Sequence, residues 1–216
     1  MIREAGERDT PFLAWVMQAA ARSHRPVGIW DVVFPGPDAP RLARLEALLR
    51  TEPRSYCHYA PFLVADEEGE PVAALCGYHP RHEGAPAMAA ALRQSLEGAG
   101  LGEAEVQATF ARFAPILTCA PDTPEDLFVV EWVATRPAWR RRGLVRELLA
   151  AVLERGRRAG FREAQISYLI GNEPARLTYE RAGFRRVAER RHPDFERVFG
   201  SPGIATMRRP LADGSA

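Results

Sequence analysis

The sequence predicts a single α/β domain, and three observations lead to this prediction. The chain has 216 residues, of which 46% are hydrophobic and 26% are charged, enough for one domain with a substantial core. Helical and strand-like patterns alternate along it without a linker, a repeat or a low-complexity segment. A strand over 127–135, a helix over 143–161 and a strand from Glu163 follow one another, as in a right-handed βαβ unit. We therefore expect one domain over residues 1–216.

The N-terminal part predicts a short strand followed by two helices. Met1 to Glu4 is strand-like, and Thr10 before Pro11 predicts a helix whose N-cap is Thr10 and whose first position is Pro11. A Pro- and Gly-rich stretch, Arg25 to Pro40, separates this helix from a second one over 41–50.

The middle of the chain predicts a hairpin and then two helices. Residues 62–78 contain two apolar segments around an acidic, Gly-containing turn, the pattern of a β-hairpin. Residues 85–118 are rich in Ala, Leu and Glu, and a Gly-Ala-Gly-Leu-Gly break at 98–102 divides them into two helices.

Composition excludes several classes of protein. The net charge is +1, which does not suggest a nucleic-acid or membrane-surface protein. All 29 basic residues are arginine, so neither a phosphate-binding loop that needs its lysine nor a lysine Schiff base is available. No apolar run approaches the ~18 residues of a membrane span, and the N-terminus lacks a signal-peptide pattern. We expect a cytoplasmic protein without a membrane partner.

The cysteines and histidines raise the question of a metal site. Cys76, His79 and His82 follow at three-residue intervals, with Cys57 and His58 as further candidate ligands. No spacing typical of zinc sites is met, and a buried thiol followed by an exposed loop explains the pattern better. The odd number of cysteines and the absence of a CxxC pair argue against a disulfide framework. We expect no metal.

An arginine-rich segment precedes the helix of the βαβ unit. Residues 136–162 contain nine arginines and two glutamates, a local charge of +7. Gly143 lies where this helix begins, and the apolar stripe of the helix anchors it in the core. The free N–H groups of the first helical turn therefore remain open to an anion. This predicts a pyrophosphate site; the alternative is a solvated basic helix end.

Three segments in order carry a family resemblance. Residues 140–145 read RRRGLV, residues 131–137 read EWVATRP, and residues 172–184 read NEPARLTYERAGF. They resemble, respectively, the Gln/Arg-x-x-Gly-x-Gly/Ala acetyl-CoA loop, the fourth strand and the last motif of the GNAT superfamily of acyl-CoA-dependent N-acetyltransferases. The resemblance implies a mixed, mostly antiparallel, twisted sheet of about seven strands flanked by helices. Residues 85–118 would then be a helical insertion before the fourth strand.

The resemblance also implies which residues bind acetyl-CoA, the expected co-substrate. In the family, the strand amide at the position of Val133 holds the thioester carbonyl, and pantetheine pairs with the strand near Thr135. Asn172 is expected to position the ligand. The full expected set is Val133, Thr135, Arg140, Arg141, Arg142, Gly143, Leu144, Val145, Arg146 and Asn172. Val145 replaces the usual Gly or Ala, so its branched side chain is expected to crowd the pyrophosphate while its N–H stays available.

Two residues are candidates for proton transfer. Glu131 interrupts an apolar strand, where a carboxylate has a raised pKa and can take the proton of an ammonium group; the alternative is an ion pair with an arginine. The resemblance makes Tyr179 the general acid for the CoA thiolate, against the alternative of an ordinary core tyrosine.

The acceptor is less defined. The family builds its acceptor pocket from segments that correspond to 28–31, 56–59 and 192–203, where aromatic residues with one acid, Asp31, suit a cationic amine. Ordinary core packing of Trp30, Tyr56 and Tyr59 is the alternative. The insertion is expected either to cover this pocket or to form a homodimer contact.

Three hypotheses on function follow. The first is an acetyltransferase that moves acetyl from acetyl-CoA to a small-molecule or peptide amine by direct attack in a ternary complex. The second is an acyl-CoA-binding sensor or scaffold without turnover. The third, an arginine-rich nucleic-acid binder, is disfavoured because Trp139 is the only aromatic residue in the basic loop before the helix.

Overall fold

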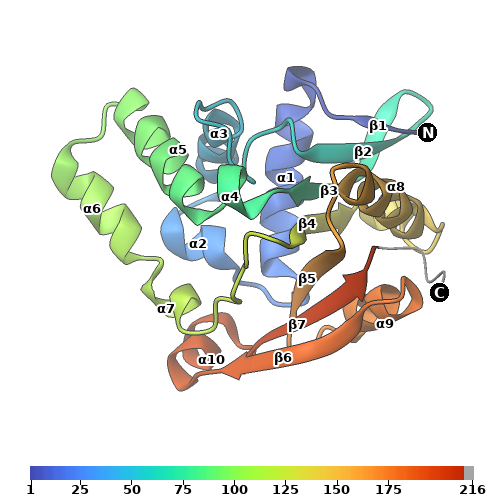
Figure 1. The fold of residues 1–216 in the computed structure, drawn as a ribbon. Coiled ribbons are helices and arrows are strands. Elements are labelled where there is room, and N and C mark those ends of the chain that lie inside the picture. The colour runs from blue at the N-terminus through green and yellow to red at the C-terminus, as the bar shows by residue number, and fades with distance from the viewer. Residues whose placement is uncertain (212–216) are drawn as a thin grey trace.

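A seven-stranded sheet forms the centre of the computed structural model, which describes residues 1–211 (Figure 1). The strand order is β1-β2-β3-β4-β5-β7-β6, and only the neighbours β4 and β5 are parallel. The strands are β1 (Ile2–Glu4), β2 (Phe62–Glu67), β3 (Glu70–Tyr78), β4 (Phe128–Thr135), β5 (Glu163–Leu169), β6 (Arg185–Arg191) and β7 (Gly203–Pro210). The expected mixed, mostly antiparallel α/β sheet is confirmed.

Helices cover both faces of this sheet. They are α1 (Thr10–Arg22), α2 (Ile29–Val33), α3 (Asp38–Leu48), α4 (Pro80–Glu83), α5 (Ala85–Gly98), α6 (Glu103–Ala111), α7 (Ala114–Leu117), α8 (Leu144–Arg158), α9 (Glu173–Arg181) and α10 (Pro193–Phe199). The apolar stripe of α8, which includes Leu148 and Val152, is fully buried on one face, here called the α8 side. Helix α1 buries Leu13 and Met17 on the opposite face, the α1 side. Each of these two helices thus packs into one layer of a two-layered core.

The start of α1 differs from the prediction. Thr10 is its first helical residue and not its cap, because a 3₁₀ turn over Glu7–Asp9 runs directly into the helix. The Asp9 carboxylate accepts hydrogen bonds from the Arg3 guanidinium at 2.7 and 2.8 Å and from the Gly6 N–H at 2.8 Å. This network holds the chain at the turn, a role that the predicted Thr cap does not fill.

Short helices lie where only loops were expected, and one of them, α4, replaces the exposed loop expected after Cys76. Helix α2 forms inside the Pro- and Gly-rich stretch, and α10 lies within residues 192–203. Asp31, in the first turn of α2, helps to cap the helix because its carboxylate accepts the N–H of Gly28, the residue before the helix, at 2.9 Å. In α10, Phe195 and Phe199 are buried in the α1-side core. Helices α2 and α10 therefore place core residues, not only connections.

The helical insertion consists of α5, α6 and the short α7, with the predicted break between Gly98 and Glu103. These helices form one flank of the molecule (Figure 1). Phe110, Phe113 and Ile116 pack against the α1-side core, and the Arg112 guanidinium donates to the Val33 carbonyl at 3.2 Å. The insertion is therefore fastened to α2.

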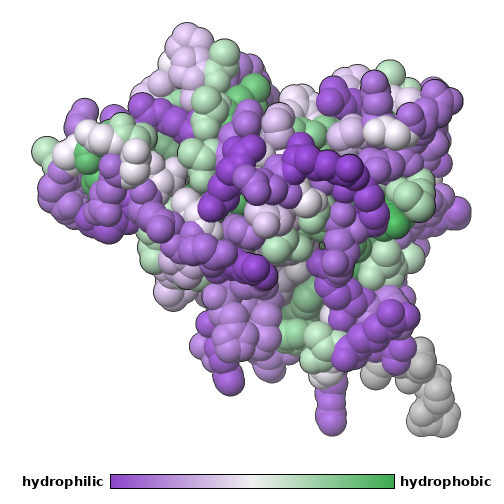
Figure 2. All heavy atoms as spheres, turned by 90° about the horizontal axis from the view of Figure 1, so that it is seen from above, coloured by the Kyte–Doolittle hydropathy of each residue, from purple (hydrophilic) through white to green (hydrophobic). Residues whose placement is uncertain are grey.

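Strand β6 ends one edge of the sheet. Strand β7 lies between β5 and β6, so the last two strands reach the sheet in reverse order. All seven residues of β6 are exposed, including four arginines. Viewed from above, the molecule is mostly hydrophilic, with apolar residues in small separate patches (Figure 2). No helix within residues 1–211 has the length and apolar character needed to cross a membrane.

Candidate active site

Strands β4 and β5 separate at the centre of the sheet. Their parallel pairing covers only Phe128–Val130 opposite Ala164–Ile166. Beyond that point β4 continues through 131–135 beside β3, and β5 continues beside β7. Along this stretch neither strand has a described neighbour on the side that faces the other. The backbone groups on these two inner edges are available to a ligand that lies between the strands.

A β-bulge lies on β4 at this opening. Glu131 pairs with Cys76 and Ala134 pairs with Ala74, so β4 carries one residue more than β3 between these pairs. Trp132 absorbs the irregularity with a left-handed φ of 54°. Val133 packs on the α8 side, whereas Trp132 packs on the α1 side. The extra residue also takes one peptide unit out of the regular ladder, near the predicted Val133 amide.

The Glu131 side chain lies at this bulge and is partly buried. Burial raises its pKa from 4.5 to about 7, and a hydrogen bond with the Tyr78 hydroxyl opposes that rise. No arginine or histidine within residues 1–211 forms an ion pair with it, so the alternative of an arginine partner is wrong. A carboxylate that is half ionised near neutral pH and lacks a cation is suited to take a proton from an amine.

The predicted anion loop leads into α8. Gly143 is the N-cap of the helix with a left-handed φ of 85°, and Arg141 has a φ of 63°. A Cβ at Gly143 would meet no described atom within 4 Å, so the space beside the helix start is open. Among the described residues, no acidic side chain pairs with Arg141 or Arg146, which are both exposed. Free N–H groups, the helix dipole and unpaired guanidinium groups are the features that the predicted anion site requires.

The other residues expected at this site have different surroundings. Arg142 stacks on Trp139, with 4.4 Å from its Cζ to the ring centroid, and Arg140 Nε donates to the Thr135 carbonyl at 3.4 Å. Leu144 is buried, and Val145 packs against the α8-side core. Val145 is partly exposed, and its expected crowding of the pyrophosphate stays a prediction.

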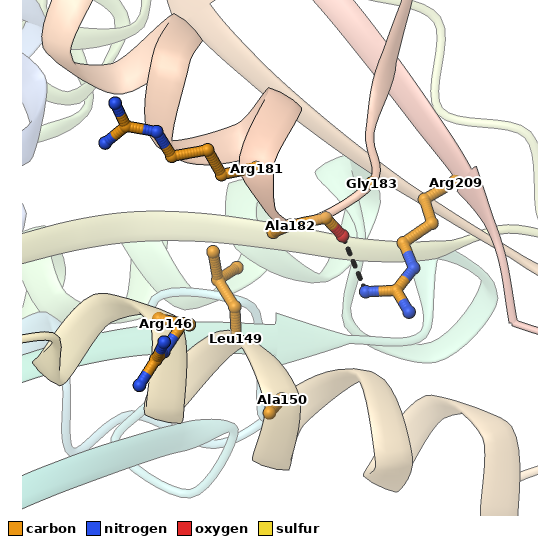
Figure 3. A pocket seen from close by; sticks show the side chains of 7 residues that line it. All are labelled: Arg146, Leu149, Ala150, Arg181, Ala182, Gly183 and Arg209. Atoms are coloured by element: carbon orange, nitrogen blue, oxygen red, sulfur yellow. Dashed lines mark hydrogen bonds between the residues drawn. The ribbon is translucent and has the colours of Figure 1, made fainter.

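A groove of about 340 Å³ continues from the start of α8 (Figure 3). Arg146, Leu149 and Ala150 line it from α8, and Arg181 lines it from α9. Arg209 of β7 is turned toward the protein, where it donates to the Ala182 carbonyl at 2.6 Å. Sequence reasoning did not find this groove, because it joins residues from three separate segments.

Asn172 caps α9 and ties it to α1. Its Oδ1 accepts the Ala175 N–H at 3.2 Å, and its Nδ2 donates to the Ser23 Oγ at 2.6 Å. Both polar groups of the side chain therefore have protein partners. The expected role in positioning a ligand stays a prediction, and it would act through the loop that Asn172 holds.

The hydroxyl-bearing residues Tyr179 and Thr135 have different surroundings. Tyr179 is 6% exposed and packs edge-on against Tyr168 and Phe184, and burial raises its pKa. Its phenol therefore stays protonated at neutral pH, as a proton donor must. The Thr135 Oγ1 is buried, and no described group forms a hydrogen bond with it. This orphaned hydroxyl, at the end of the open edge of β4, fits a polar ligand between the strands.

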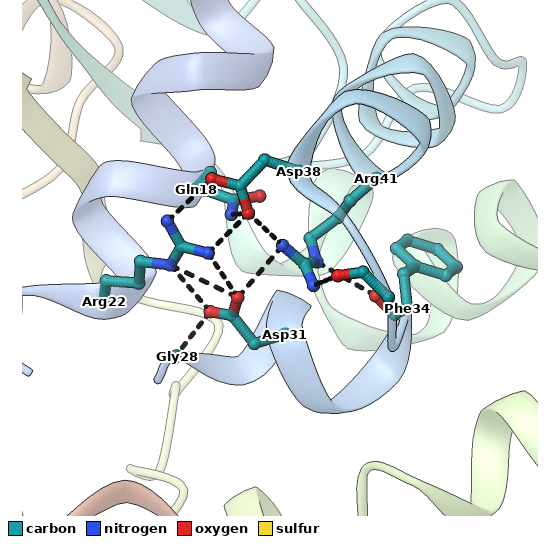
Figure 4. Close-up of polar contacts among 8 residues, drawn as sticks. Gln18, Arg22, Gly28, Asp31, Phe34, Asp38 and Arg41 are labelled. Carbon is teal, nitrogen blue, oxygen red and sulfur yellow. Dashed lines mark hydrogen bonds and ion pairs between the residues drawn. The ribbon is translucent and has the colours of Figure 1, made fainter. Parts of the chain in front are cut away.

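The acidic residue expected in the acceptor pocket is already paired. Arg22 donates to the Asp31 carboxylate at 2.6 Å, and Arg41 lies 3.0 Å from it (Figure 4). Asp38 joins the same network, with 2.7 Å to Arg22 and 2.6 Å to Arg41. Asp31 therefore fixes α2 between α1 and α3 and does not offer a free charge to an amine. This corrects the expectation for residues 28–31.

Aromatic residues do gather near Glu131, as expected for the acceptor side. Trp30 and Tyr56 are joined there by Trp132 and Tyr78, which sequence reasoning did not assign to the pocket. Regular strand alternation would place Trp132 on the face of the sheet opposite Glu131. The β-bulge puts both side chains on the same face, and the sequence pattern does not show this.

The cysteine and histidine cluster has a structural explanation. His79 caps α4, accepting the Arg81 N–H at 3.3 Å, and the His58 Nδ1 accepts the Ala60 N–H at 3.1 Å. Cys57, Cys76 and Cys119 are free and buried. Within residues 1–211 no group of three or more His, Cys, Asp or Glu side chains is arranged to hold a metal ion.

An open mixed sheet whose two parallel strands separate beside a basic helix start is the architecture expected of an acetyltransferase fold. Comparison with known families agrees: residues 28–184 match the model of the acetyltransferase (GNAT) family. The chain belongs to the GNAT acetyltransferase family. Comparison with curated proteins yields no match.

Solved structures share the fold at low sequence identity. An acetyltransferase superposes with a TM-score of 0.72 at 18% identity, covering 98% of this chain and 100% of that one. An N-acetyltransferase from Staphylococcus aureus Mu50 gives 0.62 at 17% identity, with 97% and 99% covered. A proposed acetyltransferase from Salmonella typhimurium, solved with its cofactor acetyl-CoA, gives 0.54 at 18% identity, with 100% and 96% covered. At these identities the likeness shows the fold.

Proposed function

We propose that the protein transfers an acetyl group from acetyl-CoA to a primary amine by direct attack in a ternary complex. The observation that carries this proposal is the Glu131 carboxylate, which has a pKa of about 7 and no described cation partner and lies where β4 and β5 separate. A structural ion pair would include an arginine, and the chain is rich in arginine. The missing cation is supplied, in this proposal, by the amine.

The proposed acetyl-CoA site runs from the strand opening to the groove on the α8 side. The Val133 amide and the Thr135 hydroxyl meet the thioester and pantetheine part. The start of α8, with Gly143 and the exposed arginines at 141 and 146, takes the pyrophosphate. The groove between Arg146 and Arg181 accommodates the adenosine part (Figure 3). Each assignment matches a polar or cationic group that has no acidic partner among the described residues.

The proposed reaction uses the two proton-transfer residues in turn. Glu131 accepts a proton from the ammonium form of the acceptor, which leaves a neutral amine. The amine nitrogen bonds to the thioester carbon, and the oxyanion is stabilised by a β4 amide. The carbon–sulfur bond then breaks, and the CoA thiolate takes the proton of the Tyr179 hydroxyl. The amide nitrogen, still protonated after its attack, passes its extra proton to the Tyr179 phenolate, and Glu131 releases its proton to solvent. The products are an N-acetylated amine and CoA.

The test measures binding and turnover separately. Isothermal titration with acetyl-CoA reports the first, and release of free thiol over a panel of amines and short peptides reports the second. We expect binding and thiol release with at least one primary amine. Binding of acetyl-CoA without thiol release from any amine or peptide would instead identify an acyl-CoA sensor or scaffold of the same fold.

Domain organisation and location complete the proposal. We propose one acetyltransferase domain over residues 1–216, because both core layers are built from segments throughout the chain. The three cysteines are free thiols, as in a reducing compartment, which agrees with a cytoplasmic location.

A further inference from the structure

Aromatic rings from several segments form a continuous cluster on the α1 side of the sheet, in which two rings are buried and three, Tyr56, Phe113 and Trp132, are partly exposed. Trp30 of α2 contacts Trp132 of β4 with 5.7 Å between ring centroids, and Trp132 stacks on Tyr56 at 6.2 Å. Tyr56 stacks in turn on Tyr78 of β3 at 5.0 Å. Phe113, at the end of the insertion, meets Trp30 edge-on at 6.3 Å. We refer to these five residues as the aromatic wall.

The carboxylate of Glu131 adjoins one end of the aromatic wall. The Tyr78 side chain is close enough to lower the pKa of this carboxylate, and Trp132 is its neighbour in the chain. The bulge turns Glu131 and Trp132 toward the same face, so the charge and the largest ring of β4 share one environment. An ammonium group at Glu131 would lie beside aromatic faces, where cation–π attraction adds to the charge pair.

Among the acids near the aromatic wall, Glu131 alone has no arginine partner and accepts no backbone N–H from the described residues. Asp31 is held by Arg22 and Arg41 (Figure 4). The Glu83 carboxylate accepts the backbone N–H of His79 at 3.1 Å. A second positive charge on a ligand would therefore enter an apolar region without a carboxylate to meet it, which is costly.

Two buried donors mark the wall as incomplete. The indole Nε1 atoms of Trp30 and Trp132 are both buried, and neither has a hydrogen-bond acceptor among residues 1–211. Trp30 is 1% exposed, so bulk water does not supply one. Buried donors in native proteins nearly always have partners. A bound molecule that carries a neutral oxygen against the wall would supply the missing acceptor.

From these contacts we propose that the acceptor is a primary amine with one positive charge on a flat and otherwise uncharged body. The ammonium group meets Glu131, and the body lies against the partly exposed rings of Trp132 and Tyr56. This inference rests on the proposed function and adds the substrate class. It excludes polyamines, for lack of a second carboxylate, and amines that carry a carboxylate, which would lie beside Glu131.

Three amines of equal length test the charge requirement. Hexylamine, 1,6-diaminohexane and 6-aminohexanoate differ only in a far end that is neutral, positive or negative, and phenethylamine adds the aromatic body. The measurement is kcat/KM for each at saturating acetyl-CoA. We expect hexylamine to exceed the diamine and the amino acid by at least about tenfold. We expect phenethylamine to exceed hexylamine.

Variants of the wall test the aromatic requirement. Trp132→Leu keeps an apolar side chain and removes the ring, and Trp132→Phe keeps a smaller ring. We expect Trp132→Leu to raise KM for phenethylamine about tenfold and Trp132→Phe to recover part of that loss, with the Kd for acetyl-CoA unchanged. The matched control is Trp15→Leu, which removes an indole stacked on Phe12 outside the wall, at 5.7 Å. Thermal unfolding of each variant checks that it folds.

Failure of this inference differs from failure of the proposed function. A preference for the diamine or for a peptide overturns the substrate class and leaves acetyl transfer standing. A preference for 6-aminohexanoate does the same and points to Arg25, whose Nε is buried without a partner in the described chain. Titration of phenethylamine onto the complex with CoA covers the case in which no amine releases thiol. Binding of phenethylamine that depends on Trp132 then upholds the amine site and overturns acetyl transfer. If phenethylamine neither binds nor releases thiol, the substrate class and acetyl transfer are both overturned.

Discussion

Replacement of Glu131 by Gln provides a test of the buried carboxylate that does not require a known acceptor. Burial raises the pKa of Glu131 from 4.5 to about 7, so the folded protein holds this proton more tightly than the unfolded chain. Stability due to Glu131 is therefore complete below pH 4.5 and is lost as the pH rises toward 7. Gln cannot ionise, and its carbonyl still accepts from Tyr78.

The pKa values set the size of the effect. A pKa difference between 4.5 and about 7 corresponds to about 3 kcal/mol, at about 1.4 kcal/mol per pH unit. Glu131 is partly exposed as a residue, so solvent screening reduces this to about 2 kcal/mol. Relative to the parent, Glu131→Gln should therefore gain about 2 kcal/mol between pH 4.5 and pH 8, on top of any constant difference.

Urea unfolding at a series of pH values measures this gain. The matched control is Glu70→Gln, an exposed glutamate at the start of β3 that has no ion pair among the described residues. The control should follow the pH dependence of the parent. A Glu131→Gln variant whose stability relative to the parent is constant from pH 4.5 to pH 8 would refute the reasoning, because Glu131 would then ionise as easily in the folded protein as in the unfolded one.

Three further predictions concern the cofactor site, the acid and the ion network. Gly143→Asp should weaken acetyl-CoA binding at least about tenfold relative to Gly143→Asn, since both side chains tolerate a left-handed φ and differ in charge; equal Kd values in isothermal titration would remove the anion site from this helix start. Tyr179→Phe should lower kcat about 10²–10⁴-fold and leave the acetyl-CoA Kd unchanged, whereas turnover at the parent rate would make Tyr179 a packing residue. Arg41→Met should lower the free energy of unfolding by about 3 kcal/mol in urea, because it strips partners from Asp31 and Asp38; a loss within 0.5 kcal/mol, about the effect of a surface change, would show that Arg22 alone holds the network.

Local patterns predicted most elements of the fold. The βαβ unit, the hairpin and the broken insertion each carry a signal within a few residues: the apolar stripe of α8, the acidic turn before β3 and the glycines at 98–102. The anion loop was predictable for the same reason, since its arginines and Gly143 are consecutive. Interactions between residues close in the sequence determine these features, so the local sequence pattern predicts them.

Features that depend on distant segments were not predictable in this way. Helix α2 forms in a Pro- and Gly-rich stretch because Asp31 meets Arg22 and Arg41, which belong to neighbouring helices. The bulge at Trp132 depends on the register between β3 and β4. The groove beside Arg146 requires α9 and β7 to pack against α8. Each of these features depends on contacts with another helix or strand, so the local sequence pattern does not predict it.

The exposed edge strand β6 has a consequence for the behaviour of many copies in solution. An unpaired strand edge can add a strand from another molecule and start aggregation. In an antiparallel pairing of two β6 strands centred on Ala188, Arg185 would face Arg191, and Arg186 would face Arg190. Like charges directly opposite each other oppose such pairing. The arginines of β6 thus oppose edge-to-edge association of two molecules, and this effect is independent of any substrate.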